Sequence, residues 1–272
     1  MSSVRPLNTV IIGAAGRMGR ALIRAAYEIP GELRVCGAVA STTSTSLGKD
    51  AGELAGIGRL DVRVTDDLAA ALARAEIVID FSQPHTTRSN LMVCRAARKP
   101  LLIGTTGYPA ELTSVFDEAA KEIPLLVAPN TSIGVTLLLE LTRMAAKALP
   151  ADFDIEIVEA HHRTKKDAPS GTALALGKAA AEGRGTVPST VATDRSGERR
   201  QGDIGYAVIR GGDIVGDHTV LFAGTGEQIT LGHRATDRAI FARGAVRAAL
   251  WLAAQPAGRY IMSDFLGLKT ST

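Results

Sequence analysis

Residues Thr9 to Ile23, TVIIGAAGRMGRALI, place three glycines between an apolar run and a stretch with apolar residues at helical spacing. Gly13, Gly16 and Gly19 thus stand where a strand passes into a helix, which is where backbone N–H groups can bind a pyrophosphate. The spacing is GxxGxxG, with Ala15 in the place of the middle glycine of the common GxGxxG pattern. A glycine-containing turn without a ligand would show the same pattern, but the position between a strand and a helix favours dinucleotide binding.

The first half of the chain continues this alternation of short apolar runs and longer helical patterns. The runs are TVIIG, LRVCGAVA, IVIDF, KPLLIG and PLLVAPN, and the helical patterns include GRALIRAAYE and PAELTSVFDEAAKE. Such alternation is typical of βαβ units, and runs that are apolar throughout belong to a parallel sheet covered on both faces. We therefore predict an α/β fold with a Rossmann-type parallel sheet, whose ligands bind beyond the carboxyl ends of the strands.

A different pattern begins after Asn130. A helix is expected from about 134 to 149, then the strand DIEIVEA, a polar loop and the Ala-rich helix TALALGKAAAE. Three further strands, IGYAVIRGG, DHTVLFAG and EQITLGH, are joined by glycine-containing turns, so antiparallel pairing and a mixed sheet are expected. The stretch 182–201 is predicted to be an exposed connection.

The last helical stretch, AIFARGAVRAALWLAA, has the apolar spacing to pack back on the first domain. We therefore expect a discontinuous dinucleotide-binding domain of residues 1–131 and 240–272. Residues 132–239 would form an α+β domain for substrate binding and oligomerisation.

The composition excludes several classes of protein. The net charge of +3 is small and the basic residues are scattered, so nucleic acid is not an expected partner, whereas an anionic metabolite is. No apolar run is long enough to span a membrane, and no targeting segment precedes the first strand, so the cytoplasm is expected. Cys36 and Cys94 lack metal-ligand spacing, so buried reduced thiols and no metal site are predicted.

The residues after the second strand bear on the choice of coenzyme. An NAD site normally has an acidic residue there to bind the ribose hydroxyls, whereas this chain has Ala40 and Ser41 followed by more hydroxyl residues. An uncharged segment does not repel a 2′-phosphate, and Arg17 can pair with one, so NADPH is favoured over NADH. The alternative is a polar loop, with a surface arginine, that contacts only water.

Two later strand ends strengthen the prediction of a coenzyme site. Small and polar residues follow the fourth and fifth apolar runs, where they would let a nicotinamide ring approach the backbone. They are Gly104, Thr105 and Thr106 after one run and Ala128, Pro129, Asn130 and Thr131 after the other. Either segment alone would be an ordinary turn.

Residues 159–173, EAHHRTKKDAPSGTA, are the densest group of chemically reactive side chains. The cluster of histidines, Arg163, Lys165 and Lys166 would create a positive field for a dicarboxylate, and Ser170, Gly171 and Thr172 would begin a helix whose N–H groups bind a carboxylate. A histidine or lysine there can supply the proton that accompanies hydride addition to an imine. A charged surface loop with Ser170 as an N-cap is the alternative. His218 and His233 lie in predicted strands and are expected to be structural.

Several stretches together resemble the dihydrodipicolinate reductase family. They are GAAGRMG, DAGELAG at 50–56, DFSQP at 80–84, IGTTG and above all EAHHRTKKDAPSGTA. The resemblance implies a Rossmann-type domain joined by the C-terminal helix, a central substrate domain that supports a homotetramer, and closure of the domains over the ligands. It also implies reduction of dehydrated hydroxytetrahydrodipicolinate, a small anionic cyclic dicarboxylate, to tetrahydrodipicolinate on the route to lysine, with NADH or NADPH.

The resemblance also implies roles for individual residues. His161 would be the proton donor or acceptor and Lys165 the proton donor. The residues implied to bind substrate are His162, Ser170, Gly171, Thr172 and Thr106, and those implied to bind coenzyme are Gly13, Ala14, Ala15, Gly16, Arg17, Met18, Gly104, Thr105, Thr106, Ala128, Pro129, Asn130 and Thr131.

Two positions depart from the family's pattern. Members often have an acidic residue followed by Arg after the second strand, for the ribose hydroxyls and the 2′-phosphate, where this chain has Ala40 and Ser41. Neither contact carries over, so the preference between NADH and NADPH stays open. Gln83 also stands where a basic residue is sometimes found.

Two other functions are compatible with the N-terminal half. One is another small Rossmann reductase or amino-acid dehydrogenase acting on an open-chain amino or keto acid, against which the histidine-lysine block argues. The other is a redox sensor that binds NADPH and a partner without turnover. Retention of His161 and Lys165 argues against a sensor, which needs no proton-transfer groups.

Overall fold

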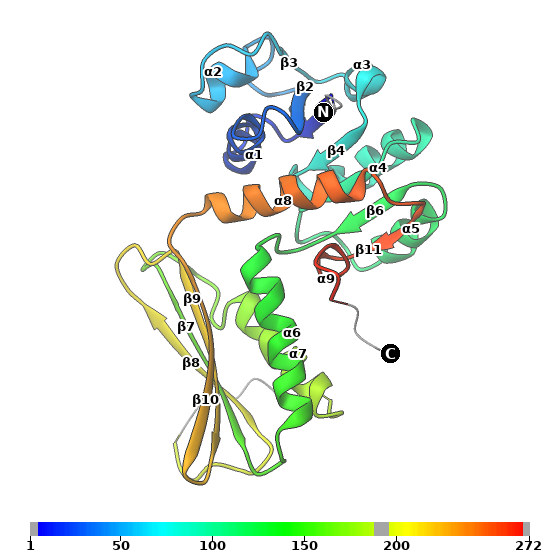
Figure 1. Cartoon of the computed structure of the whole chain (residues 1–272). Coiled ribbons are helices and arrows are strands. Elements are labelled where there is room, and N and C mark those ends of the chain that lie inside the picture. The colour runs from blue at the N-terminus through cyan, green and yellow to red at the C-terminus, as the bar shows by residue number, and fades with distance from the viewer. Residues whose placement is uncertain (1–4, 188–195, 269–272) are drawn as a thin grey trace. The chain divides into compact units, whose positions relative to one another are not determined.

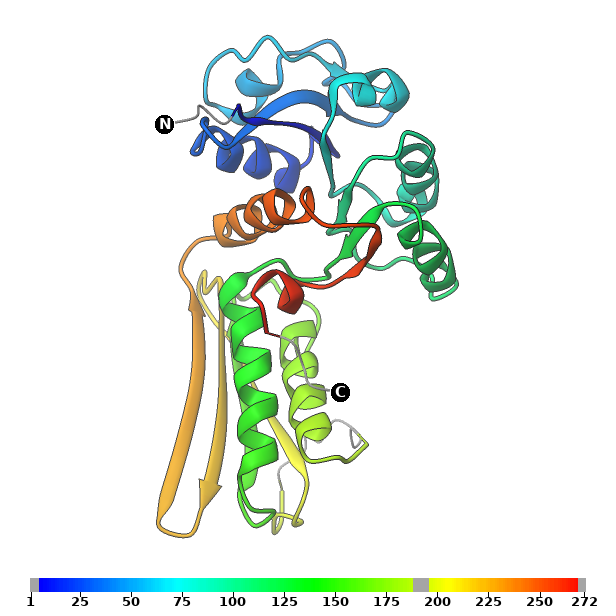
Figure 2. The same ribbon diagram turned by 45° about the vertical axis from the view of Figure 1, so that its right-hand side comes forward.

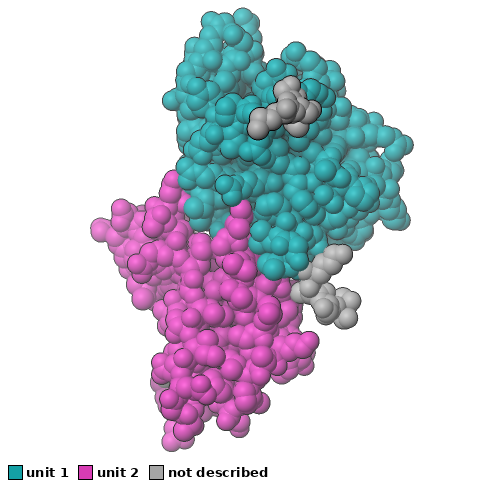
Figure 3. All heavy atoms as spheres, in the orientation of Figure 1, with its two compact units in different colours: residues 1–132, 239–272 teal, residues 133–238 magenta. Residues whose placement is uncertain are grey.

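The computed structural model describes residues 5–187 and 196–268. Two compact units make up the chain, residues 1–132 with 239–272 (unit 1) and residues 133–238 (unit 2), shown in teal and magenta in Figure 3. Each boundary differs by one residue from the boundary expected from sequence. Residues 188–195 of the predicted exposed connection lie outside the described residues.

Unit 1 is built on a parallel sheet with the strand order β11-β6-β5-β4-β1-β2-β3. Its strands are β1 (Leu7–Ile12), β2 (Leu33–Val39), β3 (Val64–Thr65), β4 (Ile77–Asp80), β5 (Leu101–Ile103), β6 (Pro124–Val127) and β11 (Gly258–Tyr260). The order reverses beside β1, which pairs with β2 on one side and β4 on the other. Ligands of such sheets bind at this reversal. The predicted Rossmann-type sheet is confirmed.

Helices cover both faces of this sheet, as Figures 1 and 2 show. They are α1 (Arg17–Tyr27), α2 (Ala51–Ala55), α3 (Leu68–Ala71), α4 (Thr87–Ala96), α5 (Leu112–Ala120), α8 (Ala239–Leu252) and α9 (Met262–Phe265), with 3-10 turns η1 (Leu72–Arg74) and η2 (Pro84–Thr86). Side chains of α1 and α8 share one apolar cluster with Ile11, and side chains of α4 and α5 share the other with Val10 and Ile12. Neighbouring residues of β1 thus enter opposite clusters, as the alternation of side chains along a strand requires.

Unit 2 contains a mixed sheet with the order β10-β9-β7-β8. Its strands are β7 (Asp154–His161), β8 (Ile204–Arg210), β9 (Gly216–Gly224) and β10 (Glu227–Ala235). Helices α6 (Ile133–Ala148) and α7 (Gly171–Gly183) lie against the same face of this sheet in Figures 1 and 2. The predicted mixed sheet is confirmed, and β9 and β10 form the expected antiparallel pair.

The expected antiparallel pairing of β8 is wrong. Strand β8 does not pair with β9 but runs parallel to β7, which lies between them and pairs with β9 on its other edge. Strand β7 therefore uses both edges, and the glycine-containing stretch 211–215 crosses its end instead of closing a hairpin. This pairing sets Arg210 beside His161, because the two residues are partners in the parallel register.

Both cysteines are free thiols. Cys94 is buried as predicted, and burial raises the pKa of its thiol to about 12. Cys36 is only half-buried, contrary to the prediction, and packs against the margin of one apolar cluster. Burial also raises the pKa of the Cys36 thiol, so neither cysteine has the lowered pKa of a reactive thiolate.

Replacing Leu91 by alanine tests the core beneath α4. Leu91 is fully buried, whereas the next residue of the same helix, Met92, is 45% exposed. We expect Leu91→Ala to lower the free energy of unfolding by about 2 to 5 kcal/mol, and Met92→Ala to lower it by less than about 1 kcal/mol. Urea denaturation of both variants measures the difference, and equal losses would contradict the assigned packing.

Candidate functional site

The glycine loop between β1 and α1 is a tight turn. Gly13 has a positive φ of 81°, and its N–H donates to the carbonyl of Val39 at 2.8 Å. The carbonyl of Gly13 accepts from the N–H of Gly16 at 2.9 Å. A Cβ at Gly13 would overlap the Phe81 carbonyl, and one at Gly19 would overlap the Gly13 carbonyl. Glycine at these positions therefore lets the loop, the helix and the next strand end approach one another closely.

The N-terminus of α1 carries no competing side chain. Gly16 is the N-cap, no side chain caps the helix, and no acidic residue lies in its first turn. The first N–H groups of a helix have no partner within it, and its dipole favours an anion there. Arg17, the first helical residue, is exposed, and Met18 and Ala15 are half-buried beside it. The loop has the chemistry that a pyrophosphate requires.

The end of β4 is held by a buried carboxyl group. Asp80 is fully buried, and its Oδ1 accepts from the N–H of Ser82 at 2.8 Å while its Oδ2 accepts from the Asn90 amide at 3.1 Å. Burial raises the pKa of Asp80, although the hydrogen bonds from Ser82 and Asn90 oppose the shift. Between these contacts the ring of Phe81 lies against Gly104, where a Cβ would overlap it. Asp80 thus fixes the loop that follows β4, the strand that lies between β1 and β5.

The predicted residues after β5 and β6 lie at neighbouring strand ends, because Ile103 and Val127 are register partners. Thr105 is buried and Thr106 exposed. The Thr131 hydroxyl donates to the Phe241 carbonyl at 2.7 Å, and the Asn130 side chain accepts from the N–H of Ser132 at 2.9 Å. Ala128 is buried and Pro129 exposed. The structure therefore brings the glycine loop, 104–106 and 128–131 together at the carboxyl ends of the strands in the unit 1 sheet.

The end of β2 presents no charged group at the two predicted positions. The N–H of Ala40 donates to the Thr65 carbonyl at 2.9 Å, and the exposed Ser41 hydroxyl lies 3.3 Å from that of Thr43. Gln83, at the N-cap of η2, is exposed. The backbone of Ala40 is thus used by the sheet, whereas the hydroxyls of 41–43 face solvent.

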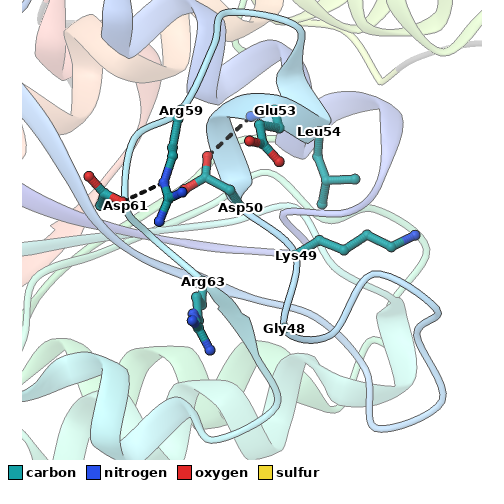
Figure 4. A pocket seen from close by; sticks show the side chains of 8 residues that line it. All are labelled: Gly48, Lys49, Asp50, Glu53, Leu54, Arg59, Asp61 and Arg63. Carbon is teal, nitrogen blue, oxygen red and sulfur yellow. Dashed lines mark hydrogen bonds and ion pairs between the residues drawn. The ribbon is translucent and has the colours of Figure 1, made fainter.

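A pocket of about 470 Å³ lies further along, in the segment between β2 and β3 (Figure 4). Its wall contains both acidic and basic residues, including Lys49, Asp50, Arg59 and Arg63. Asp50 accepts hydrogen bonds from the N–H groups of Gly52, Glu53, Leu60 and Val62. Although burial opposes the shift, these bonds lower the pKa of Asp50. The DAGELAG motif therefore forms α2 with Asp50 as its N-cap, and Asp50 also binds the loop that follows the helix.

In unit 2, the predicted chemical loop begins at the end of β7. Glu159 and His161 are two residues apart and share the buried face of the strand with Ile155 and Ile157. The Nδ1 atom of His161 lies 2.6 Å from Oε2 of Glu159. The N–H of Ser170, at the far end of the loop, donates to Oε1 of the same carboxylate at 2.9 Å.

Arg210 on β8 completes the contacts of this carboxylate. Its two terminal nitrogens donate to the two oxygens of Glu159 at 2.7 and 2.8 Å, and one of them also donates to the Asp167 carbonyl at 2.7 Å. Burial alone would raise the pKa of Glu159, but the hydrogen bonds from Arg210, His161 and Ser170 lower it. Glu159 is therefore an ionised carboxylate inside the protein.

Ser170 begins α7 as its N-cap. Its hydroxyl oxygen accepts from the N–H of Ala173 at 3.2 Å and lies 3.0 Å from Nε2 of His218. Burial, followed by the proximity of His161, lowers the pKa of His218 to about 4, so this imidazole is neutral at neutral pH. The Ser170 side chain is buried within the unit, whereas Gly171 is exposed and a Cβ there would meet open space.

The remaining loop residues are closer to solvent. Nζ of Lys165 lies 2.8 Å from Oδ2 of Asp167, and Nδ1 of His162 lies 2.7 Å from the Thr164 hydroxyl. Partial burial, followed by the proximity of Arg238 and His161, lowers the pKa of His162. Thr172 is half-buried in the first turn of α7. The predicted substrate and proton-transfer residues of unit 2 therefore lie on one short loop and the helix start that follows it.

The sequence did not single out Glu159 or Arg210 as a functional residue, and it gave no sign that His218 contacts Ser170. A signal for Glu159 was present, because DIEIVEAH alternates and puts Glu159 and His161 on the face of β7 that Ile155 and Ile157 bury. Arg210 carries no local signal, because its position depends on the parallel pairing of β8 with β7.

Within residues 5–187 and 196–268, no group of three or more His, Cys, Asp or Glu side chains is placed to hold a metal ion. Over the same residues, no helix has the length and apolar character needed to cross a bilayer.

Comparison with known proteins gives matches along nearly the whole chain. A family model described as "Dihydrodipicolinate reductase, N-terminus" matches residues 7–131, and one described as "Dihydrodipicolinate reductase, C-terminus" matches residues 134–266. A 4-hydroxy-tetrahydrodipicolinate reductase of Alkalilimnicola ehrlichii is 54% identical over 95% of this chain and 98% of its own length. A relative with the same name, numbered 1, in Mesorhizobium japonicum is 50% identical over 98% of this chain and 100% of its own.

Solved structures share the fold. A dipicolinate-bound dihydrodipicolinate reductase from Paenisporosarcina sp. TG-14 has a TM-score of 0.76 and 23% identity, and covers 94% of this chain and 97% of its own. An amine dehydrogenase from Mycobacterium smegmatis has a TM-score of 0.62 and 16% identity, with 96% of both chains covered. At these identities the likeness concerns the fold alone.

The neutral His218 predicts a pH dependence of stability. Its pKa is about 4 when folded and near 6.5 when exposed, so the unfolded chain binds more protons between these values. The free energy of unfolding therefore falls as the pH falls through this window, by up to about 1.4 kcal/mol per pH unit. We expect His218→Gln to reduce this slope and His85→Gln, on an exposed turn, to retain it. Urea denaturation between pH 7 and pH 4 measures both, and parallel curves for wild type and His218→Gln would contradict the assignment.

Proposed function

Because the chain belongs to the dihydrodipicolinate reductase family, we propose that it is a 4-hydroxy-tetrahydrodipicolinate reductase. It would reduce a dihydrodipicolinate-type cyclic imine to tetrahydrodipicolinate with NADPH or NADH, in the diaminopimelate route to lysine. One observation carries the proposal: the loop 159–171 joins His161 and Lys165 to the open helix start at Gly171. Proton-transfer groups and an anion-binding group thus lie within a single short segment.

The residues at the carboxyl ends of the unit 1 strands fit a dinucleotide. The loop Gly13, Ala14, Ala15, Gly16, Arg17 and Met18 would hold the pyrophosphate, since the start of α1 has no capping side chain and no acidic residue in its first turn. The segments 104–106 and 128–131 would line the nicotinamide end. When bound, the coenzyme supplies the hydride.

Unit 2 would bind the substrate and supply the proton for its reduction. The N–H groups at the start of α7, with His162 and Thr172, would bind a carboxylate of the cyclic dicarboxylate, and Thr106 of unit 1 is proposed as a further contact. Hydride addition to the conjugated imine needs one accompanying proton, which His161 or Lys165 would supply. Lys165 lies beside Asp167, whose carboxylate keeps an ammonium group in place.

We further propose that the protein prefers NADPH to NADH. Support comes from the end of β2, where Ala40 and Ser41 place no carboxylate that would repel a 2′-phosphate. Arg17, exposed at the start of α1, is available as a cation on the phosphate side. A homotetramer assembled through unit 2, which rests on the family resemblance, and a cytoplasmic location belong to the proposal as well.

Kinetics with both coenzymes tests the proposal. Loss of reduced nicotinamide absorbance would be followed with enzymatically generated hydroxytetrahydrodipicolinate, and kcat/KM compared for NADPH and NADH. Turnover, with a higher kcat/KM for NADPH, is the expected result. Turnover of an open-chain amino or keto acid instead would favour a different dehydrogenase, and coenzyme binding without any turnover would favour a sensor.

Replacing Lys165 by alanine tests its role in proton supply. We expect Lys165→Ala to lower kcat by about 100-fold or more while the affinity for coenzyme stays at the wild-type level. Lys178→Ala removes another lysine, one that is paired with Glu182 on α7, and serves as the control. Steady-state kinetics and coenzyme titration measure the two effects, and full activity of Lys165→Ala would remove Lys165 from the mechanism.

A further inference from the structure

The carboxylate of Glu159 receives four hydrogen-bond donors. Oε1 accepts from the N–H of Ser170 and from Arg210, and Oε2 lies beside His161 Nδ1 and accepts from Arg210. The side chain is 1% exposed. A carboxylate with this many donors is satisfied without water, so its position is set by the protein alone.

These contacts decide which nitrogen of His161 exchanges protons. An ionised carboxylate only accepts hydrogen bonds, so the hydrogen between Glu159 and His161 belongs to Nδ1. The proton that is gained and lost is then the one on Nε2, in the same way that a carboxylate on Nδ1 sets the tautomer of the histidine in a catalytic triad. Nε2 faces Gly216 on β9, where a Cβ would come within 3.1 Å of it.

Arg210 extends the same support to Lys165. Besides Glu159 it donates to the Asp167 carbonyl, and the Asp167 side chain forms the ion pair with Lys165. The Glu159–Arg210 pair is thus connected to His161, to the lysine and to the N–H of Ser170 at the start of α7. The three parts of the loop to which the proposed function gives a chemical role converge on this one pair.

We propose that Glu159 and Arg210 are the positioning residues of the reduction: Glu159 holds Nδ1–H of His161 so that Nε2 transfers the proton, and Arg210 fixes Glu159 and the Asp167 turn. This inference rests on the proposed function. Neither residue touches the reacting atoms, so both act through His161 and Lys165.

The charged and titratable groups around His161 come from every neighbouring segment. Glu159 on β7 is negative, Arg210 on β8 is positive, and His218 on β9 and His162 in the loop are imidazoles whose pKa values are lowered. Glu159 is the negative group in contact with the ring. Its removal disfavours the imidazolium, so the limb of the pH profile that belongs to His161 moves to lower pH.

Glu159→Gln tests the inference, because the amide keeps the size of the side chain but cannot accept on both ends. We expect kcat/KM to fall by about 100-fold, and the His161 limb of the pH profile to move down by about one unit. Coenzyme affinity, measured by titration, is expected to stay at the wild-type level. A loss that is merely structural would lower activity without moving the limb.

Glu156→Gln is the matched control. Glu156 lies on the same strand and pairs with Arg199, but on the opposite face and away from His161. This variant also loses a contact between a carboxylate and an arginine, and its pH profile is expected to match that of wild type. If it showed the same shift as Glu159→Gln, the shift would reflect loss of charge on β7 in general and the inference would fail.

Arg210→Lys is a second variant that tests the inference even if Glu159→Gln does not fold. Lysine retains the charge but not the fork that reaches both oxygens and the Asp167 carbonyl. We expect kcat to fall while the His161 limb stays near its wild-type position, because Glu159 remains ionised. Wild-type kcat in this variant would overturn the role of Arg210.

The tautomer gives a readout that needs no substrate. In wild-type protein labelled with ¹⁵N-histidine, the His161 signal, assigned by its loss in His161→Asn, is expected to show hydrogen on Nδ1 at a pH where the ring is neutral. Hydrogen on Nε2 instead would overturn the inference. Absence of wild-type turnover would overturn the proposed function, and this inference with it, whereas wild-type turnover with an unaltered Glu159→Gln overturns the inference alone.

Discussion

The ionised carboxylate of Glu159 is the interaction on which the geometry of the unit 2 loop depends. The His161 ring, two residues after Glu159, and the Ser170 N–H, eleven residues after it, both contact this carboxylate. Arg210 contacts it from the neighbouring strand β8. Without a buried acceptor at this place, the end of β7 and the start of α7 would have no common anchor. The loop between them can therefore be polar and exposed while its two ends stay fixed.

In unit 1 the predicted ligand site depends instead on glycines, which have no side chain. Gly13 and Gly104 both adjoin Phe81, and a Cβ on either would overlap it. The strand ends of β1, β4 and β5 can come this close only because these positions carry no side chain, and the buried Asp80 holds the connecting loop in place. Backbone N–H groups are then what the loop offers, which suits a phosphate better than a charged side chain of uncertain direction.

Periodicity predicted most of the elements, because it reflects burial directly. The five apolar runs became β1, β2, β4, β5 and β6, and the helical patterns became α1, α5, α6, α7 and α8. Strand β3 was missed because two residues are too few to show a pattern, and β11 because Gly258–Tyr260 is not an apolar run. The parallel partner of β7, and with it the place of Arg210, could not be predicted, because register between distant strands is decided by the packing of the whole sheet.

The cost of burying ions explains why the Glu159–Arg210 pair argues for function over stability. Removing two charges from water costs several kcal/mol per ion, and their attraction seldom exceeds this by much. The chain shows what a more solvated pair looks like at the other end of β7, where Arg199 contacts Glu156 and the Glu156 side chain is 24% exposed. Glu159, by contrast, is placed on the face that Ile155 and Ile157 fill with apolar side chains. An apolar residue there would satisfy the core equally well, so what the carboxylate adds is direction: a fixed imidazole, a fixed helix start and a lysine held by the adjoining turn.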